Sequence, residues 1–272
     1  MTGLPGEEGH AERYDWLTLP FVQQYTPLLL AGAVVPDAGR VLDHGAGTGE
    51  VSLEVHRRFP SAAVTAVDPD ARLLDRLRAK AGPNAEWLRV LTGTVDTVDV
   101  GVAVDVVFSQ LVLSLTTDPA HELRALRGLM RPRGLLRAAV VGGPARMRAF
   151  AGFWAAAEAV VPGAAPPVAY PHLRFADPEM LRRVAVEAGW ADARVEPADT
   201  RRTVTSAELW EWLSQTLPLY TADRRAIPLY DLGSALLEEL RLSVLSEFQQ
   251  YRDARGWYDV PTGGWLLTGT AG

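Results

Sequence analysis

The sequence predicts an α/β fold in which a mostly parallel sheet carries helices on both faces. Short apolar runs alternate with segments of helical spacing between residues 40 and 145, as expected of a doubly wound sheet. The run 104–109 is almost continuously apolar, which is typical of a strand buried on both faces. A glycine-rich turn at 43–50 joins the first strand-like run to the first helical segment.

Local signals place the elements in order along the chain. Prolines at positions 20 and 27 interrupt an apolar N-terminal stretch, which predicts one or two short helices. Asp118-Pro119 and Asp177-Pro178 each pair a capping residue with a proline at the first helical position, so each predicts a helix start. Thr205 and Glu208 have the spacing of a capping box. The expected strands are 40–43, 63–68, 86–91, 104–109, 135–141, 194–204 and 265–270, and the expected helices are 50–58, a segment through 73–77, 118–130, 146–161, 178–188, one from 205 and a long one over 222–252.

The same pattern predicts the domain organisation. Residues 1–13 are rich in Gly and Glu and are expected to be disordered. Residues 14–272 are interpreted as a single domain with lid helices at 14–36 and a core at 37–204 and 263–272. The segment 205–262 is long for an insertion between two strands. We therefore expect a helical cap formed by about 145–176 and 205–262.

Composition excludes several classes of protein. The net charge is −6 over 272 residues, which argues against a nucleic-acid binder, because such a protein needs a basic face. The chain has no cysteine, so disulfides, cysteine-ligated zinc and thiolate catalysis are excluded. The N-terminal region lacks a basic and then apolar leader, and the longest apolar run, 28–35, is too short to cross a bilayer. We expect a cytoplasmic protein, a monomer or a homodimer, with neither nucleic acid nor membrane as partner.

The glycine-rich turn is the most informative motif. Glycine tolerates positive φ and has no Cβ, so the bare main chain at Gly45, Gly47 and Gly49 is expected to lie against a nucleotide-like ligand. The dinucleotide fingerprint has its third glycine one place later, where this chain has Glu50, and no P-loop lysine follows. Asp68 ends the second expected strand, nineteen residues after Gly49. An acid there accepts hydrogen bonds from ribose hydroxyls in nucleotide-binding folds, or it caps the next helix.

These motifs resemble those of class I S-adenosyl-L-methionine (SAM) dependent methyltransferases. Asp43-x-Gly45-x-Gly47-x-Gly49 resembles the first motif, and Ala66-Val67-Asp68-Pro69-Asp70 is similar to the second. The third motif departs, because Gly93-Thr94 stands where Gly-Asp is usual. The resemblance covers roughly residues 35–145 and is strongest to small-molecule enzymes of the ubiquinone-biosynthesis and trans-aconitate types. It implies a Rossmann-like, doubly wound, seven-stranded sheet with an antiparallel last strand and a helical cap.

The resemblance also implies a cofactor site for SAM, with S-adenosyl-L-homocysteine as the product. Asp43 would fix the glycine turn or bind the methionine amino group. Thr94 would accept a hydrogen bond at the adenine, or Asp96 would replace it. The sequence lacks both the acid and the Asp-Asn pair that would hold a catalytic metal. No metal site is therefore expected. The cofactor-binding candidates are Asp43, His44, Gly45, Ala46, Gly47, Gly49, Asp68, Pro69, Thr94, Val95, Ser109, Gln110 and Tyr25.

Methyl transfer from a sulfonium is an in-line displacement, so such an enzyme mainly aligns the reactants and excludes water. His172, in a proline-rich loop, is the candidate general base, or else a solvent-exposed loop residue. His44 is expected to act through its backbone and not its ring. Four aromatic residues, Tyr14, Trp16, Trp154 and Trp210, are candidates to line the substrate site, the alternative for each being core packing.

The sequence therefore predicts methyl transfer to a small, partly apolar metabolite, chiefly at oxygen and in secondary metabolism of the natural-product type. One alternative is a SAM-binding cyclase or pericyclase-like enzyme that uses the sulfonium as a fixed charge without transferring the methyl group. A second is a non-catalytic nucleotide-binding module. The long cap argues against this second alternative, because a simple binder has little need to cover its ligand.

Overall fold

The protein is described by a computed structural model in which residues 9–164, 173–220 and 226–272 are placed. The chain forms two compact units. The first contains the chain up to Val140, together with Asp177–Ala198 and Trp265–Gly272. The second contains Val141–Ala176 and Asp199–Gly264. Each unit is described by itself below.

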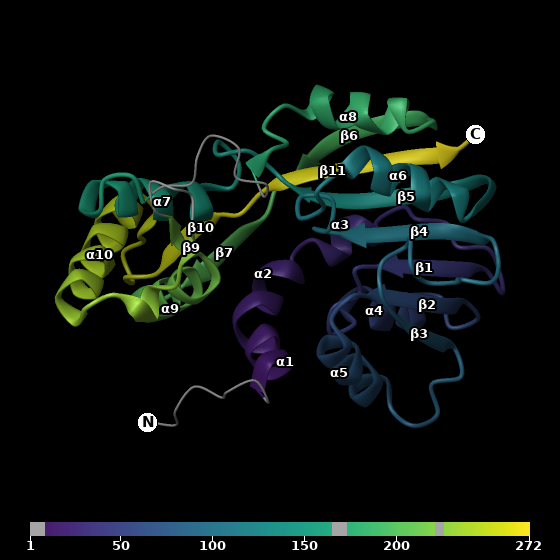
Figure 1. Ribbon diagram of the computed structural model, residues 1–272, viewed down its shortest axis with the longest axis horizontal. Coiled ribbons are helices and arrows are strands. Elements are labelled where there is room, and N and C mark those ends of the chain that lie inside the picture. Colours follow the sequence, from purple (N-terminus) through teal and green to yellow (C-terminus); the bar gives the residue numbers. More distant parts are fainter. Residues whose placement is uncertain (1–8, 165–172, 221–225) are drawn as a thin grey trace. The chain divides into compact units, whose positions relative to one another are not determined.

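The first unit is built on a seven-stranded sheet with the strand order β3-β2-β1-β4-β5-β11-β6. Parallel pairs join β1 to β2, β1 to β4, β2 to β3 and β4 to β5. The arrow of β11 runs opposite to that of β4 (Figure 1). The predicted sheet, mostly parallel with an antiparallel last strand, is confirmed. Its strands are β1 (Arg40–His44), β2 (Ala63–Asp68), β3 (Leu88–Thr92), β4 (Val104–Gln110), β5 (Met130–Val141), β6 (Trp190–Ala198) and β11 (Gly264–Ala271).

The helices of this unit begin at the capping residues expected from the sequence. Asp118 accepts a hydrogen bond from the amide of His121, and Asp177 accepts one from the amide of Glu179. Helices α4 and α5 pack on β2, and α6 packs against α8. The core between these layers is formed by side chains such as Leu74 and Phe108, which are fully buried. The helices are α3 (Thr26–Leu30), α4 (Glu50–Arg58), α5 (Ala71–Ala81), α6 (Pro119–Gly128) and α8 (Pro178–Glu187).

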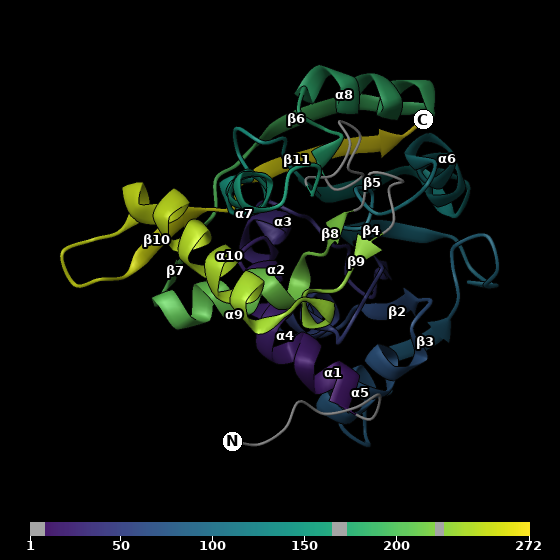
Figure 2. The same ribbon diagram turned by 60° about the vertical axis from the view of Figure 1, so that its left-hand side comes forward.

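The N-terminal segment is helical from His10 onward. It consists of α1 (His10–Arg13), a π-helix η2 (Tyr14–Thr18) and α2 (Leu19–Val22). Disorder was expected up to residue 13, but α1 lies beside α5 (Figures 1 and 2). Contacts with α5 accompany this helix, since His10 lies 3.1 Å from Asp70 and Glu12 lies 3.9 Å from Arg76, and Ala11 is buried.

In its described residues, the second unit contains three longer helices and two small antiparallel sheets. β7 pairs with β10, and β8 pairs with β9. The predicted capping box is confirmed. The side chain of Glu208 accepts a hydrogen bond from the amide of Thr205, and the hydroxyl of Thr205 accepts one from the amide of Glu208. The elements are α7 (Arg148–Val160), β7 (Arg201–Val204), α9 (Ser206–Thr216), β8 (Leu219–Tyr220), β9 (Ala226–Ile227), η4 (Leu229–Asp231), α10 (Ser234–Glu247), η5 (Phe248–Tyr251) and β10 (Tyr258–Pro261).

Two expectations for this part of the chain are wrong. The single strand expected over 194–204 is two strands, because β6 ends in the large sheet at Ala198 and β7 pairs with β10 instead. The turn between them is held by the Thr200 hydroxyl, which donates to the carbonyl of Thr262 at 2.8 Å. The long helix expected over 222–252 begins only at Ser234, because Pro228 and Gly233 precede it and neither favours a helix interior.

Candidate functional site

The glycine-rich turn follows β1 and leads into α4 with three residues in left-handed backbone conformations. The φ angles are +70° at Gly45, +54° at Gly47 and +94° at Gly49. The amides of Gly45 and Ala46 both donate to the carbonyl of Val67, at 2.8 and 3.0 Å. The end of β2 therefore fixes the start of the turn.

The three glycines are required for different reasons. A Cβ at Gly45 would lie 2.2 Å from Cγ2 of Val112, and a Cβ at Gly49 would lie 2.1 Å from Cδ1 of Leu77. At Gly47 the nearest atom is the hydroxyl of Tyr14, at 3.3 Å. The absence of a Cβ at Gly45 and Gly49 lets the turn pack closely on the protein, and at Gly47 it leaves room for Tyr14. That the main chain of the turn lies against a ligand stays a prediction.

Two buried carboxylates hold the turn and its helix. Asp68 accepts a hydrogen bond from the amide of Gly47 at 2.9 Å and another from the amide of Asp70 at 2.8 Å. Helix α5 is capped by Asp70, whose side chain accepts from the amide of Arg72. The alternative reading, in which Asp68 caps this helix, is thus not the arrangement found. Asp68 lies where the end of β2 meets the glycine turn.

Asp43 fixes the first turn of α4. Its Oδ2 accepts hydrogen bonds from the amide and the hydroxyl of Ser52, at 2.9 and 2.6 Å. Burial raises the pKa of Asp43 to about 6, although the hydrogen bonds from Ser52 act in the opposite direction. The carboxyl group therefore titrates in the mildly acidic range and not near its usual value.

A cavity opens beside the turn. Of the candidates named from the sequence, Asp43, Gly45, Ala46, Gln110 and Tyr14 line it. The remaining lining residues, which the sequence did not single out, are Leu19, Val22, Thr48, Glu50 and Val51. Asp43 and Glu50 are acidic, and none of these ten residues is a lysine or arginine. Burial also raises the pKa of Glu50. The charge of the lining suits a cationic group and disfavours a phosphate.

Tyr14 contributes a phenol to this cavity from the N-terminal segment. Burial raises the pKa of its hydroxyl well above the usual value, and the charge of Asp68 adds to the effect. The phenol therefore stays protonated at physiological pH and can donate a hydrogen bond.

The loop after β3 lies next to the end of β2, because the amide of Gly93 donates to the carbonyl of Asp68 at 3.0 Å. Thr94 is exposed, and its amide donates to the hydroxyl of Thr97 at 2.8 Å. Val95 is buried. Asp96 pairs with the ring of His121 through both carboxylate oxygens, at 3.0 Å each, so its side chain is already engaged on the surface.

Ser109 and Gln110 end β4 beside the turn, and each makes contacts that the sequence did not indicate. Gln110 accepts from the hydroxyl of Thr26 and donates to the carbonyl of Val22, at 3.1 Å each. Ser109 contacts Nδ1 of His44 at 3.0 Å. The other ring nitrogen of His44 lies 2.7 Å from Glu122. The expected backbone role of His44 leaves out this ring contact, although a histidine at the end of a buried strand indicates that its ring needs partners.

The other candidates are distributed over both units. Tyr25 is fully buried and packs edge-on against Phe21, with ring centroids 5.8 Å apart, so it does not line the cavity. Trp154 is 4% exposed and donates to the carbonyl of Pro218 at 3.1 Å, so it is a core residue of the second unit. Trp16 is 57% exposed, which rules out the core-packing alternative for it. Pro69 follows Asp68 directly, and His172 lies outside the described residues.

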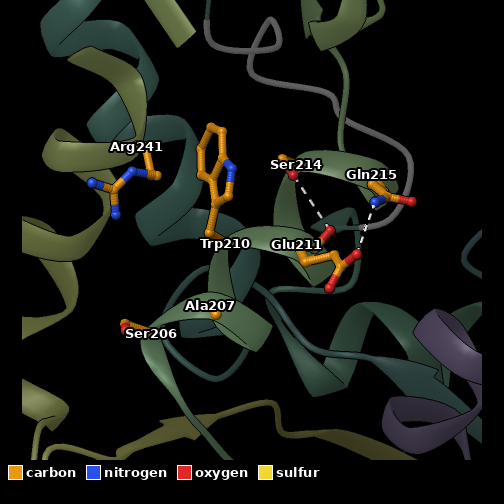
Figure 3. Close-up of a pocket in the computed structure, with 7 residues that line it drawn as sticks. All are labelled: Ser206, Ala207, Trp210, Glu211, Ser214, Gln215 and Arg241. Carbon is orange, nitrogen blue, oxygen red and sulfur yellow. Dashed lines mark hydrogen bonds between the residues drawn. The ribbon is translucent and has the colours of Figure 1, made fainter. Parts of the chain in front are cut away.

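Trp210 lines a separate groove of the second unit, shown in Figure 3. Its indole stands between Arg241 of α10 and Ser214 of α9. Glu211 and Gln215 point away from the indole and contact each other. Among the described residues there is no group of three histidine, aspartate or glutamate side chains placed to hold a metal ion. Within the same ranges, no helix is long and apolar enough to cross a membrane.

The curated proteins to which this chain is similar are all methyltransferases. Residues 41–134 match the methyltransferase domain family. Malonyl-acyl-carrier-protein O-methyltransferase of Xylella fastidiosa is 35% identical over 106 residues, which are 38% of this chain and 35% of that protein. Ubiquinone/menaquinone biosynthesis C-methyltransferase of Desulfotalea psychrophila is 34% identical over 28% of this chain and 33% of that protein. Trans-aconitate 2-methyltransferase of an Azoarcus species is 32% identical over 40% of this chain and 41% of that protein.

The chain spans between 33% and 50% of the length of the curated relatives that it matches. Among solved structures, a Bacillus halodurans protein described as a methyltransferase matches with a TM-score of 0.60 at 14% identity, over 90% of this chain and 98% of that one. The 4+2 cyclase SpnF matches with a TM-score of 0.56 at 15% identity, over 99% of this chain and 97% of that one. At these identities the likeness is one of fold alone.

Proposed function

We propose that this chain, whose residues 41–134 are a class I SAM-dependent methyltransferase domain, transfers the methyl group of SAM to a small, partly apolar metabolite. The family match and the methyltransferase relatives confirm the resemblance seen in the motifs. SAM is the cofactor of this domain. Transfer to oxygen and a role in secondary metabolism are the finer parts of the proposal, and the relative named as an O-methyltransferase supports oxygen as the acceptor.

The observation that carries the proposal is the fit between the cavity and the chemistry of SAM. SAM has no phosphate, and its ammonium and sulfonium groups outweigh its one carboxylate, so its net charge is positive. The cavity beside the glycine turn is lined by Asp43 and Glu50 with no lysine or arginine. The glycine turn contributes Gly45, Ala46 and Thr48 to the lining of this cavity, so a ligand bound there would lie against the turn. Asp68 lies beside the turn at the end of β2, where an acid binds ribose hydroxyls in related folds.

When bound, SAM supplies an electrophilic methyl group on a good leaving group. The residues of the chain would bind and orient: Asp68 would accept from the ribose, Asp43 and Glu50 would face the ammonium group, and the Tyr14 phenol would donate a hydrogen bond. Trp16, exposed two residues after Tyr14 in the same helix, would present an apolar surface to the acceptor. Alignment and exclusion of water then account for catalysis.

Isothermal titration calorimetry with SAM and S-adenosyl-L-homocysteine tests the proposal. We expect both ligands to bind. The variant Asp68→Ala should raise both dissociation constants about tenfold or more, because the charge-assisted hydrogen bond between the Asp68 carboxylate and the ribose is lost. Asp75→Asn is the matched control, because Asp75 is an exposed residue of the neighbouring helix that pairs with Arg78. Unchanged affinity in Asp68→Ala would refute the ribose assignment, and no binding by the native protein would refute the function.

A cyclase that keeps SAM bound without transferring methyl is the second candidate. The threonine at position 94, in place of the usual acid, supports it, and the fold is one that the cyclase SpnF also has. Mass spectrometry of the turnover product distinguishes the two. A product heavier than the substrate by one CH₂ means methyl transfer, whereas an isomer of unchanged mass means cyclisation.

A further inference from the structure

The ring of His44 lies in a buried polar contact that the function proposed above does not use. His44 is the last residue of β1 and immediately precedes Gly45. It is 4% exposed. Its Nε2 lies 2.7 Å from Oε1 of Glu122 on α6, and its Nδ1 lies 3.0 Å from Oγ of Ser109 on β4. Both ring nitrogens therefore have partners, and the ring orientation is fixed.

The chemistry of the partners assigns the hydrogens. An ionised carboxylate only accepts, so Nε2 carries the hydrogen that goes to Glu122. The hydroxyl of Ser109 can then donate to Nδ1 of the neutral ring. Glu122 lies in the first turn of α6, where the helix dipole favours a negative charge.

The position of the glycine turn is set from two sides. On the side of β2, the carbonyl of Val67 and the carboxylate of Asp68 accept from its amides. On the side of β4, Gly45 packs so closely on Val112 that no Cβ could be accommodated. The His44 contacts with Ser109 and Glu122 lie on this same side. The ring contacts of His44 are therefore made by the residue from which the turn begins.

We propose that His44 is a positioning residue, whose ring, held by Glu122 and Ser109, sets the glycine turn in the conformation that receives the amino-acid part of SAM. The inference rests on the proposed function, since it takes SAM as the ligand. Glu122 acts through His44 and does not touch the ligand. Removing its carboxylate leaves a buried ring nitrogen without a partner, which is costly and frees the ring to move.

The test compares two ligands in Glu122→Ala, Glu122→Gln and the native protein by calorimetry. S-adenosyl-L-homocysteine has the amino-acid part, and 5′-methylthioadenosine lacks it. For Glu122→Ala we expect the dissociation constant of S-adenosyl-L-homocysteine to rise about tenfold and that of 5′-methylthioadenosine to change less than about threefold. Glu122→Gln keeps an acceptor oxygen for Nε2, so it should restore the affinity to within about threefold of native.

Arg124→Gln is the matched control, because Arg124 is an exposed residue of the same helix. It should bind both ligands as the native protein does. A loss of affinity for both ligands by the same factor in Glu122→Ala would show general destabilisation and overturn the inference. So would unchanged affinity for both ligands, even with a lowered unfolding temperature. If the native protein bound neither ligand, the proposed function itself would fail and the inference with it.

Discussion

The hydroxyl of Thr48, in the glycine turn, donates a hydrogen bond to Oδ1 of Asp15, in the N-terminal π-helix, at 2.6 Å. The same oxygen accepts from Lys80 at 2.6 Å, and Oδ2 accepts from Arg76 at 2.9 Å. Lys80 also donates to the Thr48 hydroxyl at 2.9 Å. Asp15 therefore ties the N-terminal segment both to the turn and to α5, and it holds the neighbouring Tyr14 against Gly47.

Replacing Asp15 by alanine should loosen this attachment. Lys80 is the only lysine of the chain, so its acetylation by an amine-selective reagent reports on the contact directly. We expect Asp15→Ala to raise the rate of Lys80 acetylation roughly fivefold or more, as local opening becomes easier. Asp75→Asn, which breaks an exposed pair on the same helix, should leave the rate unchanged. Equal rates in native protein and Asp15→Ala would contradict the attachment.

The attachment should persist at mildly acidic pH. Burial tends to raise the pKa of Asp15, but hydrogen bonds from Lys80, Thr48 and Arg76 outweigh it and lower the pKa below its usual value of 3.8. A carboxyl group whose pKa is lowered on folding contributes stability above the unfolded pKa and loses it as the pH falls through the folded pKa. The Lys80 acetylation rate, corrected for the ionisation of a free amine, should therefore show no opening between pH 7 and pH 5.

Asp43 should show the opposite dependence on pH. Its pKa rises from 3.8 to about 6 because it is buried, so between these values the folded protein binds more protons than the unfolded chain. The free energy of unfolding should then fall as the pH rises through this window, by up to about 3 kcal/mol. Asp43→Asn keeps an acceptor for the Ser52 amide but cannot titrate. Urea unfolding at pH 4.5, 5.5 and 6.5 should give a flatter profile for this variant, and identical profiles would disprove the assignment.

Two glycines of the turn should respond differently to alanine. At Gly49 the new methyl group would clash with Leu77 in addition to the strain of a positive φ, which together cost about 2–5 kcal/mol. At Gly47 the strain of a positive φ dominates, and costs about 1–2 kcal/mol. The methyl group there points at Tyr14, so Gly47→Ala should weaken S-adenosyl-L-homocysteine binding. Urea unfolding and calorimetry measure the two effects, and an equal loss of stability in both variants would refute the distinction.

The features that can be predicted from the sequence are those that depend on residues close together in the chain. The capping residues Asp118, Asp177 and Thr205 and the alternation of strands and helices each depend on neighbouring residues, and the fold followed from them. Contacts between distant residues had no such signal. Asp15 meets Arg76 and Lys80 across more than sixty positions, and the ring of His44 meets Glu122 across 78. Tyr25 and Trp154 were assigned by residue type, which does not reveal whether an aromatic ring faces a cavity or the core.

The capping box at the start of α9 provides a test within the second unit. Thr205 Oγ1 accepts from the Glu208 amide at 3.3 Å, and Glu208 accepts from the Thr205 amide at 2.8 Å. The amide and the hydroxyl of Thr205 both donate to Oε2 of Glu208, at 2.8 Å each, and these two hydrogen bonds lower the pKa of Glu208. The contribution of Glu208 to stability is therefore present above the unfolded value of 4.5 and is lost as the pH falls through the folded pKa. At pH 7 Thr205→Ala should lower the free energy of unfolding by about 1 kcal/mol. Ser206→Ala, one residue inside the helix and exposed, should lower it by less than about 0.5 kcal/mol, and a similar loss in both variants would contradict the capping role.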